Sequence, residues 1–276
     1  MATGADRQQV HRGSIQGAVA VGEDPDRWID VVENLENGGA PELQRVRDRA
    51  AAAVLKMEDE ENGNAPVFIK RHGERRLQHE AREAHFTRPP GERCWEAAEV
   101  LARCSVATPR VRASLQVVEG TYLVADYFVA DGITSGPSFS TLLASRELGA
   151  GARSRLLTDL AHLVAHLHLK GVFHNDLKPA HVFRLEDGSL SLIDLEFLAL
   201  VDRRTRRYEV ARYGDITTMM REFDSLTTSA ERRAIGETYK RASGLSATEP
   251  LTMQYHWVHG TRGSEGGRGR RRRGSR

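Results

Sequence analysis

Cysteine is scarce in this sequence, and long apolar runs are missing from it. Cys94 and Cys104 are the only two cysteines in 276 residues, and both fall in one segment with the apolar spacing of a helix. Such a pair cannot readily form a disulfide, so a small secreted domain built on disulfides is excluded. The first 22 residues have no charged start followed by an apolar run, and no stretch approaches the length of a membrane span. We therefore predict neither a classical signal peptide nor a membrane-spanning helix, and we expect a cytoplasmic protein.

No low-complexity linker divides the interior of the chain. With 39% hydrophobic and 28% charged residues, the composition is that of a globular protein with enough apolar material for a core. One folded domain over residues 24–258 is the simplest interpretation. Residues 1–23 are polar and rich in glycine, so we expect a disordered leader there.

Positive charge is concentrated in a Gly/Arg tail, residues 259–276, which we also expect to be disordered. Seven arginines lie in this tail against one acidic residue, and the rest of the chain has 33 basic and 37 acidic residues. The tail cannot bury apolar surface, and its charge suits a phosphate-rich surface such as an anionic membrane or a nucleic acid. A solvated end without a specific partner is an equally open alternative.

The apolar pattern predicts a small α+β lobe over about residues 24–129. Asp24-Pro25 is typical of a helix start, and Asn37-Gly38-Gly39 is typical of a helix end. A hairpin, a helix and two strands follow, at 51–57 with 66–70, at 92–104, and at 111–118 with 121–129. A larger, mainly helical lobe over about 138–258 is predicted from helical spacing at 153–169, 208–223 and 230–242.

The candidate catalytic residues gather between His174 and Asp194. Asp176 lies between His174 and Lys178, and Asp194 ends an apolar strand. The strands expected at 181–184 and 190–193 form a hairpin, which would bring the two aspartates together. Phosphoryl transfer from ATP needs a carboxylate beside the acceptor hydroxyl, cations near the phosphates and oxygen ligands for magnesium. The cluster therefore predicts a phosphotransferase site.

The run His174-x-Asp176-Leu177-Lys178-Pro179, followed by Ile193-Asp194, resembles the catalytic loop and metal-binding strand of the protein-kinase-like superfamily. Where protein kinases have a metal-binding asparagine, this chain has His181. That histidine and the run 192–196 make the chain more similar to the lipopolysaccharide kinase (Kdo/WaaP) family. Weaker similarities are found at 67–72, at 107–110 and at Arg212-x-x-Asp215.

The resemblance covers about residues 50–245 and implies a bilobal protein-kinase-like fold with a reduced C-terminal lobe. It implies ATP as co-substrate and Mg²⁺ as cofactor. Asp176 would be the catalytic base, accompanied by His174, and Lys178 would neutralise the transferred phosphoryl group. Asp194 would be the principal magnesium ligand, and His181 a second ligand or an orienting group.

Five residues are implied in nucleotide binding. Lys70 would pair with the α- and β-phosphates, with Glu96 as its partner on the following helix. The backbone of the hinge would bind adenine, and the residues expected there are Asp126, Tyr127 and Phe128. Besides His181, the chain departs from the kinase pattern in two further places. No G-x-G-x-x-G loop precedes Lys70, so the hairpin around 49–53 would cover the phosphates, and Cys94 aligns with the usual helix glutamate.

The acceptor is not specified by these residues. The absence of an Ala-Pro-Glu-like motif and of a long activation segment after Glu196 favours a sugar, lipid-linked or other small acceptor over a protein. The resemblance implies a sugar hydroxyl of a lipopolysaccharide-type glycan, at the inner face of the membrane. A serine/threonine protein kinase and a catalytically silent kinase-like binding module remain as alternatives. A zinc site around His162 and His166 is disfavoured because no H-E-x-x-H is present.

Overall fold

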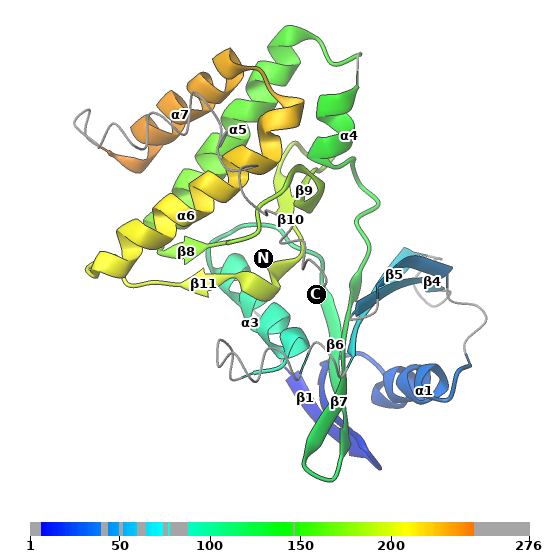
Figure 1. Ribbon diagram of the computed structural model, residues 1–276. Helices are drawn as coiled ribbons and strands as arrows, with labels where there is room; N and C mark the ends of the chain where they lie inside the picture. The colour runs from blue at the N-terminus through cyan, green and yellow to red at the C-terminus, as the bar shows by residue number, and fades with distance from the viewer. Residues whose placement is uncertain are drawn as a thin grey trace, which may run out of the picture.

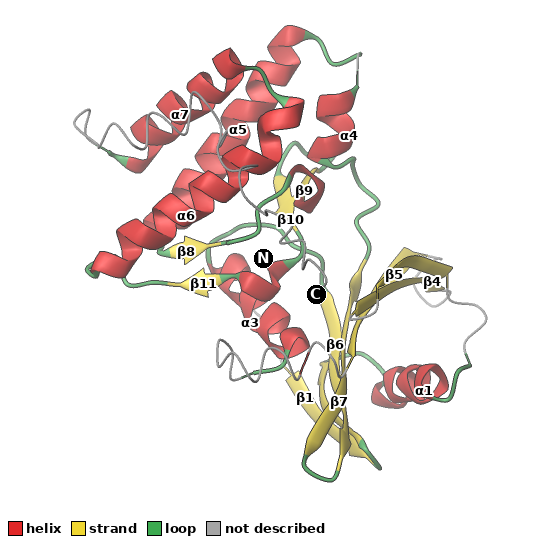
Figure 2. Cartoon of the chain, viewed as in Figure 1, coloured by secondary structure: helices red, strands yellow, loops and turns green. Residues whose placement is uncertain are grey.

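The chain folds into a β-sheet lobe and a helical lobe, which Figure 1 and Figure 2 show from the same side. The computed structural model describes residues 7–39, 44–49, 52–59, 65–73, 77, 88–145 and 147–245. The expected α+β class, with a small β-rich N-terminal lobe and a mainly helical C-terminal lobe, is confirmed. The predicted Gly/Arg tail lies outside the described residues.

A seven-stranded antiparallel sheet, of order β1-β2-β6-β7-β5-β4-β3, forms the N-terminal lobe. Its strands are β1 (Arg7–Arg12), β2 (Ile15–Ala20), β3 (Gln44–Arg49), β4 (Ala52–Asp59), β5 (Ala65–Gly73), β6 (Val111–Glu119) and β7 (Tyr122–Asp131). The predicted hairpin corresponds to β4 and β5, and the two later predicted strands to β6 and β7. The hairpin expected to cover the phosphates joins β3 to β4, and its turn lies outside the described residues.

Two helices cover opposite faces of this sheet (Figure 2). Helix α1 (Pro25–Glu36) begins where predicted, because the side chain of Asp24 accepts a hydrogen bond from the Asp26 amide at 3.0 Å. It buries Trp28 against one face, while α3 (Pro90–Arg103) buries Trp95 against the other. The sheet therefore has two cores, and α3 lies on the side of the helical lobe.

The expectation of a disordered leader over residues 1–23 is wrong for residues 7–20. These residues form the β1–β2 hairpin, and β2 pairs with β6 along the edge of the sheet. Strand β2 buries Ile15 and Val19 on one face and small alanines on the other. Gly17 permits the close pairing, because a Cβ there would lie 2.2 Å from the carbonyl oxygen of Ser114. The glycine that suggested disorder is thus required by a strand contact.

The C-terminal lobe is built around the long helix α5 (Ala150–Leu169), with α6 (Arg206–Phe223) and α7 (Ser229–Ser243) beside it. Its remaining elements are α4 (Phe139–Ala144), β8 (Val172–Phe173), η2 (Pro179–His181), β9 (Val182–Arg184), β10 (Leu190–Leu192), η3 (Leu195–Phe197), β11 (Ala199–Leu200) and η4 (Asp224–Leu226). The three predicted helices and the predicted hairpin of β9 and β10 are confirmed. Among the residues that the structure describes, no helix is long and apolar enough to cross a bilayer.

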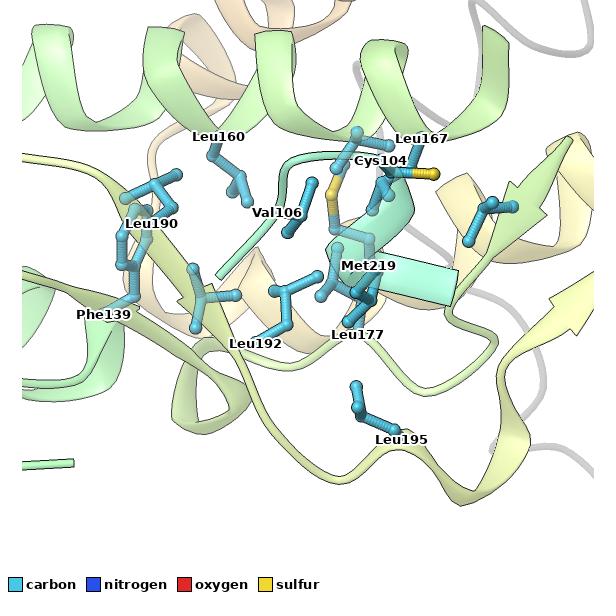
Figure 3. Close-up of a cluster of buried hydrophobic side chains, with 14 of the residues drawn as sticks. Cys104, Val106, Phe139, Leu160, Leu167, Leu177, Leu190, Leu192, Leu195 and Met219 are labelled. Carbon is cyan, nitrogen blue, oxygen red and sulfur yellow. The ribbon is translucent and has the colours of Figure 1, made fainter. Parts of the chain in front are cut away.

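The core of this lobe fixes the loops that carry the candidate site (Figure 3). Leu177 of the first loop and Leu195 of the second are buried in the same cluster as Leu192 and Met219. Strand β11 pairs with β8, and the Ile193 amide donates to the His181 carbonyl at 3.0 Å. Loops 174–181 and 193–198 are therefore held side by side from both ends.

Candidate active site

Three side chains from these two loops converge on one point. Asp176, His181 and Asp194 each offer a ligand atom, and these atoms lie within 4.8 Å of one another. The predicted approach of Asp176 and Asp194 is thus confirmed. It arises because the β9–β10 hairpin folds the chain back on itself between the two loops.

Asp194 has an unusual backbone, which turns the chain sharply at the end of β10. Its φ and ψ angles are 61° and 55°, in the left-handed region that aspartate tolerates better than most residues. The side chain then faces Lys70 of β5, with 2.5 Å between Oδ1 and Nζ. Burial by itself would raise the pKa of Asp194, but the Lys70 charge outweighs burial and holds this pKa below its ordinary value. Asp194 is therefore a carboxylate, the form that binds cations.

Lys70 lies in the site as predicted, but its second partner was not foreseen. Glu196, two residues after Asp194 in η3, places Oε2 3.2 Å from the lysine Nζ. Burial would lower the pKa of Lys70, and the facing Glu196 and Asp194 outweigh it and raise this pKa. The lysine is thus a firmly charged ammonium between two carboxylates.

The prediction of Glu96 as the partner of Lys70 is wrong. Glu96 is exposed on α3 and pairs with Arg88. Cys94 faces the site instead, fully buried, and burial raises the pKa of its thiol. A neutral thiol cannot compensate the positive charge of Lys70, and the compensating carboxylate is that of Glu196, from the loop after Asp194. The sequence did contain this residue, since Glu196 belongs to the run 192–196 that carries the family resemblance.

Lys178 and His181 are arranged around Asp176. The Lys178 Nζ lies 2.7 Å from one carboxylate oxygen of Asp176 and 2.8 Å from the other. His181 Nδ1 lies 2.9 Å from the Asp176 carbonyl oxygen, which can only accept, so this nitrogen carries the proton. In the neutral ring, Nε2 then presents its lone pair to Asp194, whose Oδ2 is 3.4 Å away. Two facing lone pairs at that distance leave room for a cation between them.

This donor set fits a divalent metal ion of intermediate hardness. The Asp194 carboxylate supplies the hard oxygen ligand that Mg²⁺ and Mn²⁺ share, with the Asp176 carboxylate close by, and the imidazole suits Mn²⁺ better than Mg²⁺. The site is half-buried, so solvent or phosphate oxygens can complete the coordination. The zinc alternative finds no support, because His166 Nε2 instead lies 2.8 Å from the Cys104 carbonyl oxygen. Cys94 and Cys104 are free, as predicted.

His174 and a residue from α6 hold the loop 174–181 in shape. The buried His174 ring donates from Nε2 to the Ile193 carbonyl at 3.1 Å, and burial lowers the pKa of this ring. Asp215 accepts from the backbone amides of His174 at 3.0 Å and Asn175 at 2.7 Å. It also lies 3.0 Å from Nε2 of the buried His168. His174 thus joins the two loops, and Asp215, noted in the sequence only as part of Arg212-x-x-Asp215, fixes the first.

The predicted adenine hinge is wrong in position. Asp126, Tyr127 and Phe128 lie inside β7, where the backbone pairs with β5 on one side and β6 on the other. Their amides and carbonyls are therefore used within the sheet. The side chain of Asp126 is fully buried, and Tyr127 bonds to Arg71 at 2.9 Å and to Glu36. The chain leaves the sheet after Asp131, so the segment 132–138 makes the crossing to the helical lobe.

Comparison with known proteins gives the geometry a context. The model of the Lipopolysaccharide kinase (Kdo/WaaP) family matches residues 44–239. CBL-interacting protein kinase 22 of Oryza sativa subsp. japonica is 32% identical over 179 residues, 59% of this chain and 37% of that protein. CBL-interacting serine/threonine-protein kinase 24 of Arabidopsis thaliana is 32% identical over 74 residues, 27% of this chain and 17% of that protein. The chain therefore spans less than half the length of either relative.

A solved structure described as "WaaP in complex with acyl carrier protein" has a similar fold. Its TM-score is 0.54 at 20% sequence identity, and the match covers 85% of this chain and 90% of that one. At this identity the likeness concerns the fold. The predicted kinase-like fold is thereby confirmed.

Proposed function

The chain belongs to the lipopolysaccharide kinase (Kdo/WaaP) family, and we propose that it is an ATP-dependent phosphotransferase with a hydroxyl group as acceptor. The observation that carries this proposal is the convergence of Lys70, Asp176 and Asp194, which come from the sheet and two separate loops. Phosphoryl transfer requires three functions together: a cationic side chain at the phosphates, a carboxylate at the acceptor and a carboxylate that binds the metal. A binding module without chemistry would not need them in one place.

Each residue has a role that follows from its position. Asp176, paired with Lys178, orients the acceptor hydroxyl and takes its proton, while Lys178 stays close enough to meet the transferred phosphoryl group. Asp194, with His181 and Asp176 beside it, would hold a divalent ion that neutralises the phosphate oxygens when bound. Lys70, which contacts Asp194, would neutralise the α- and β-phosphates of ATP.

The proposed acceptor is a sugar hydroxyl of a lipopolysaccharide-type glycan. Family membership supports it, and so does the short connection from Asp194 to α6, which consists of residues 195–205. Protein kinases hold a peptide on a long segment at this place, and this chain offers only η3 and β11 there. The partial matches to serine/threonine kinases are short relative to those proteins and carry less weight.

The test is turnover of ATP by the purified full chain with Mg²⁺ or Mn²⁺, with a dephosphorylated lipopolysaccharide core oligosaccharide as acceptor. We expect phosphate on the glycan, and a mixture of peptides that contain serine and threonine serves as the comparison acceptor. Asp176→Asn should abolish transfer and keep nucleotide binding, whereas Asp194→Asn should weaken metal–nucleotide binding as well.

Three outcomes distinguish the alternatives. Phosphate on the peptide alone would indicate a protein kinase. Nucleotide binding without any turnover, with or without acceptor, would indicate a silent binding module. Full activity in both aspartate variants would contradict the assignment of the site.

A further inference from the structure

We propose that His72 is a positioning residue for phosphoryl transfer, holding Glu196 against Lys70 and linking this pair to the start of α3. The inference rests on the proposed kinase function. In protein kinases a helix glutamate couples the helix to the phosphate-binding lysine. Here we assign this coupling to three buried side chains, of which His72 and Asp126 come from the sheet and Glu196 from η3.

A series of short side-chain contacts connects the site to the helix. Oε2 of Glu196 lies 3.2 Å from the Lys70 Nζ and 3.1 Å from Nε2 of His72. The other ring nitrogen of His72 lies 3.1 Å from Oδ2 of Asp126. That same oxygen accepts the backbone amide of Gly91, in the first turn of α3, at 2.8 Å.

The three side chains are buried, which strengthens these hydrogen bonds. The side chains of His72 and Asp126 are 0% exposed and that of Glu196 is 5% exposed. In such surroundings each carboxylate needs a donor, and no water competes for it. Ionised carboxylates only accept hydrogen bonds, and each ring nitrogen of His72 lies within hydrogen-bond distance of one of the two carboxylates. A ring held at both ends has a single orientation, and it fixes the flexible glutamate next to Lys70.

The first turn of α3 packs closely against the sheet, so the contacts of His72 and Asp126 connect the position of this helix to Lys70. A Cβ added at Gly91 would lie 2.8 Å from the Ser114 Oγ and 3.0 Å from the Tyr127 carbonyl oxygen. The first turn therefore lies directly on β6 and β7. Cys94 is an α3 residue whose thiol lies near Lys70, and burial raises the pKa of this thiol. His72 and Asp126 provide a polar connection between Glu196, the partner of Lys70, and the first turn of α3.

The experiment compares His72→Gln and Glu196→Gln with the double variant, by steady-state ATP turnover in the full chain. Each single change removes the hydrogen bond between the His72 ring and the Glu196 carboxylate, so we expect the KM for ATP to rise about tenfold or more, with a smaller fall in kcat. The double variant should be no more than about twofold worse than either single one, because both break the same connection. His162→Gln, on the exposed face of α5, is the matched control and should leave both constants unchanged.

Two outcomes would overturn the proposal. One is an unchanged KM in His72→Gln, and the other is a double variant in which the KM increases of the two single variants multiply. If His72→Gln does not fold, Asp126→Asn tests the far link: it should raise the KM for ATP and speed hydrogen exchange of the Gly91 segment, and wild-type values for both would refute the connection. An inactive wild type would instead count against the kinase function itself, which keeps the two failures distinct.

Discussion

Glu196 lies 3.2 Å from Lys70 through Oε2 and Nζ, and this carboxylate occupies the role that the sequence had suggested for Glu96. The two glutamates differ in surroundings as well as in place. Glu196 is buried beside the lysine, whereas Glu96 is exposed and pairs with Arg88. The lysine therefore depends on the loop that also carries Asp194.

This pair gives a matched prediction. Glu196→Gln should raise the KM for ATP about tenfold, since the loss of a buried charge-assisted bond costs about 1.5–3 kcal/mol. Glu96→Gln should leave KM and kcat within about twofold of wild type, because an exposed ion pair contributes about 0–1 kcal/mol. Steady-state kinetics on the two variants decide it. A larger effect at Glu96 would restore the helix glutamate as the functional partner.

The second prediction concerns the metal preference that His181 creates. With imidazole in the site, we expect half-maximal activity at a lower concentration of Mn²⁺ than of Mg²⁺. His181→Asn supplies an amide oxygen and should keep substantial activity while shifting the preference toward Mg²⁺. His181→Ala should lose activity that raised metal concentration partly restores. Identical metal titrations in the three proteins would mean that His181 only orients the loop through its bond to the Asp176 carbonyl.

The third prediction tests the N-terminal hairpin with two glycines. Gly17→Ala should destabilise the fold by about 1–3 kcal/mol, because the new methyl group would lie 2.2 Å from the Ser114 carbonyl oxygen. Gly214→Ala is the control, since this exposed helical glycine in α6 has nothing within 4 Å of an added Cβ. It should stabilise by about 0.5–1 kcal/mol. Denaturant unfolding measures both, and a harmless Gly17→Ala would show that the hairpin is not tightly paired.

The fourth prediction is a pH dependence of stability from Glu36. Burial would raise the pKa of this carboxyl, but hydrogen bonds from Arg71 and Tyr127 outweigh it and lower the pKa below the ordinary value of 4.5. A group whose pKa is lower in the folded state stabilises the fold above pH 4.5 and loses this contribution as the pH falls further.

Glu36→Gln should therefore cost about 1 kcal/mol of unfolding free energy at neutral pH, a modest figure because both partners are partly exposed. The difference from wild type should shrink as the pH falls below 4.5. Glu237→Gln, on an exposed position of α7, should run parallel to wild type throughout. A gap that persists or widens in acid would contradict the assignment.

Local sequence patterns were sufficient for much of the fold. Apolar spacing with Asp24-Pro25 and Asn37-Gly38-Gly39 defined α1, and the spacing alone located α3, α5, α6 and α7 to within a few residues. The hairpin expected between Asp176 and Asp194 was sufficient to predict that these two residues lie close together. These are short-range features, because a helix or a hairpin depends on residues that are close along the chain.

Tertiary structure decided the rest. The sequence could not place β1 and β2, because an edge strand of small and polar residues is stable only once β6 is there to pair with. We expected the adenine hinge at residues that lie inside β7. The sequence does not show that β5 and β6 pair with both edges of this strand and occupy its backbone groups. The partner of Lys70 was also beyond it. Whether Glu96 or Glu196 reaches the lysine depends on which way α3 turns and on how the loop after Asp194 folds back, and both are set by packing between distant segments.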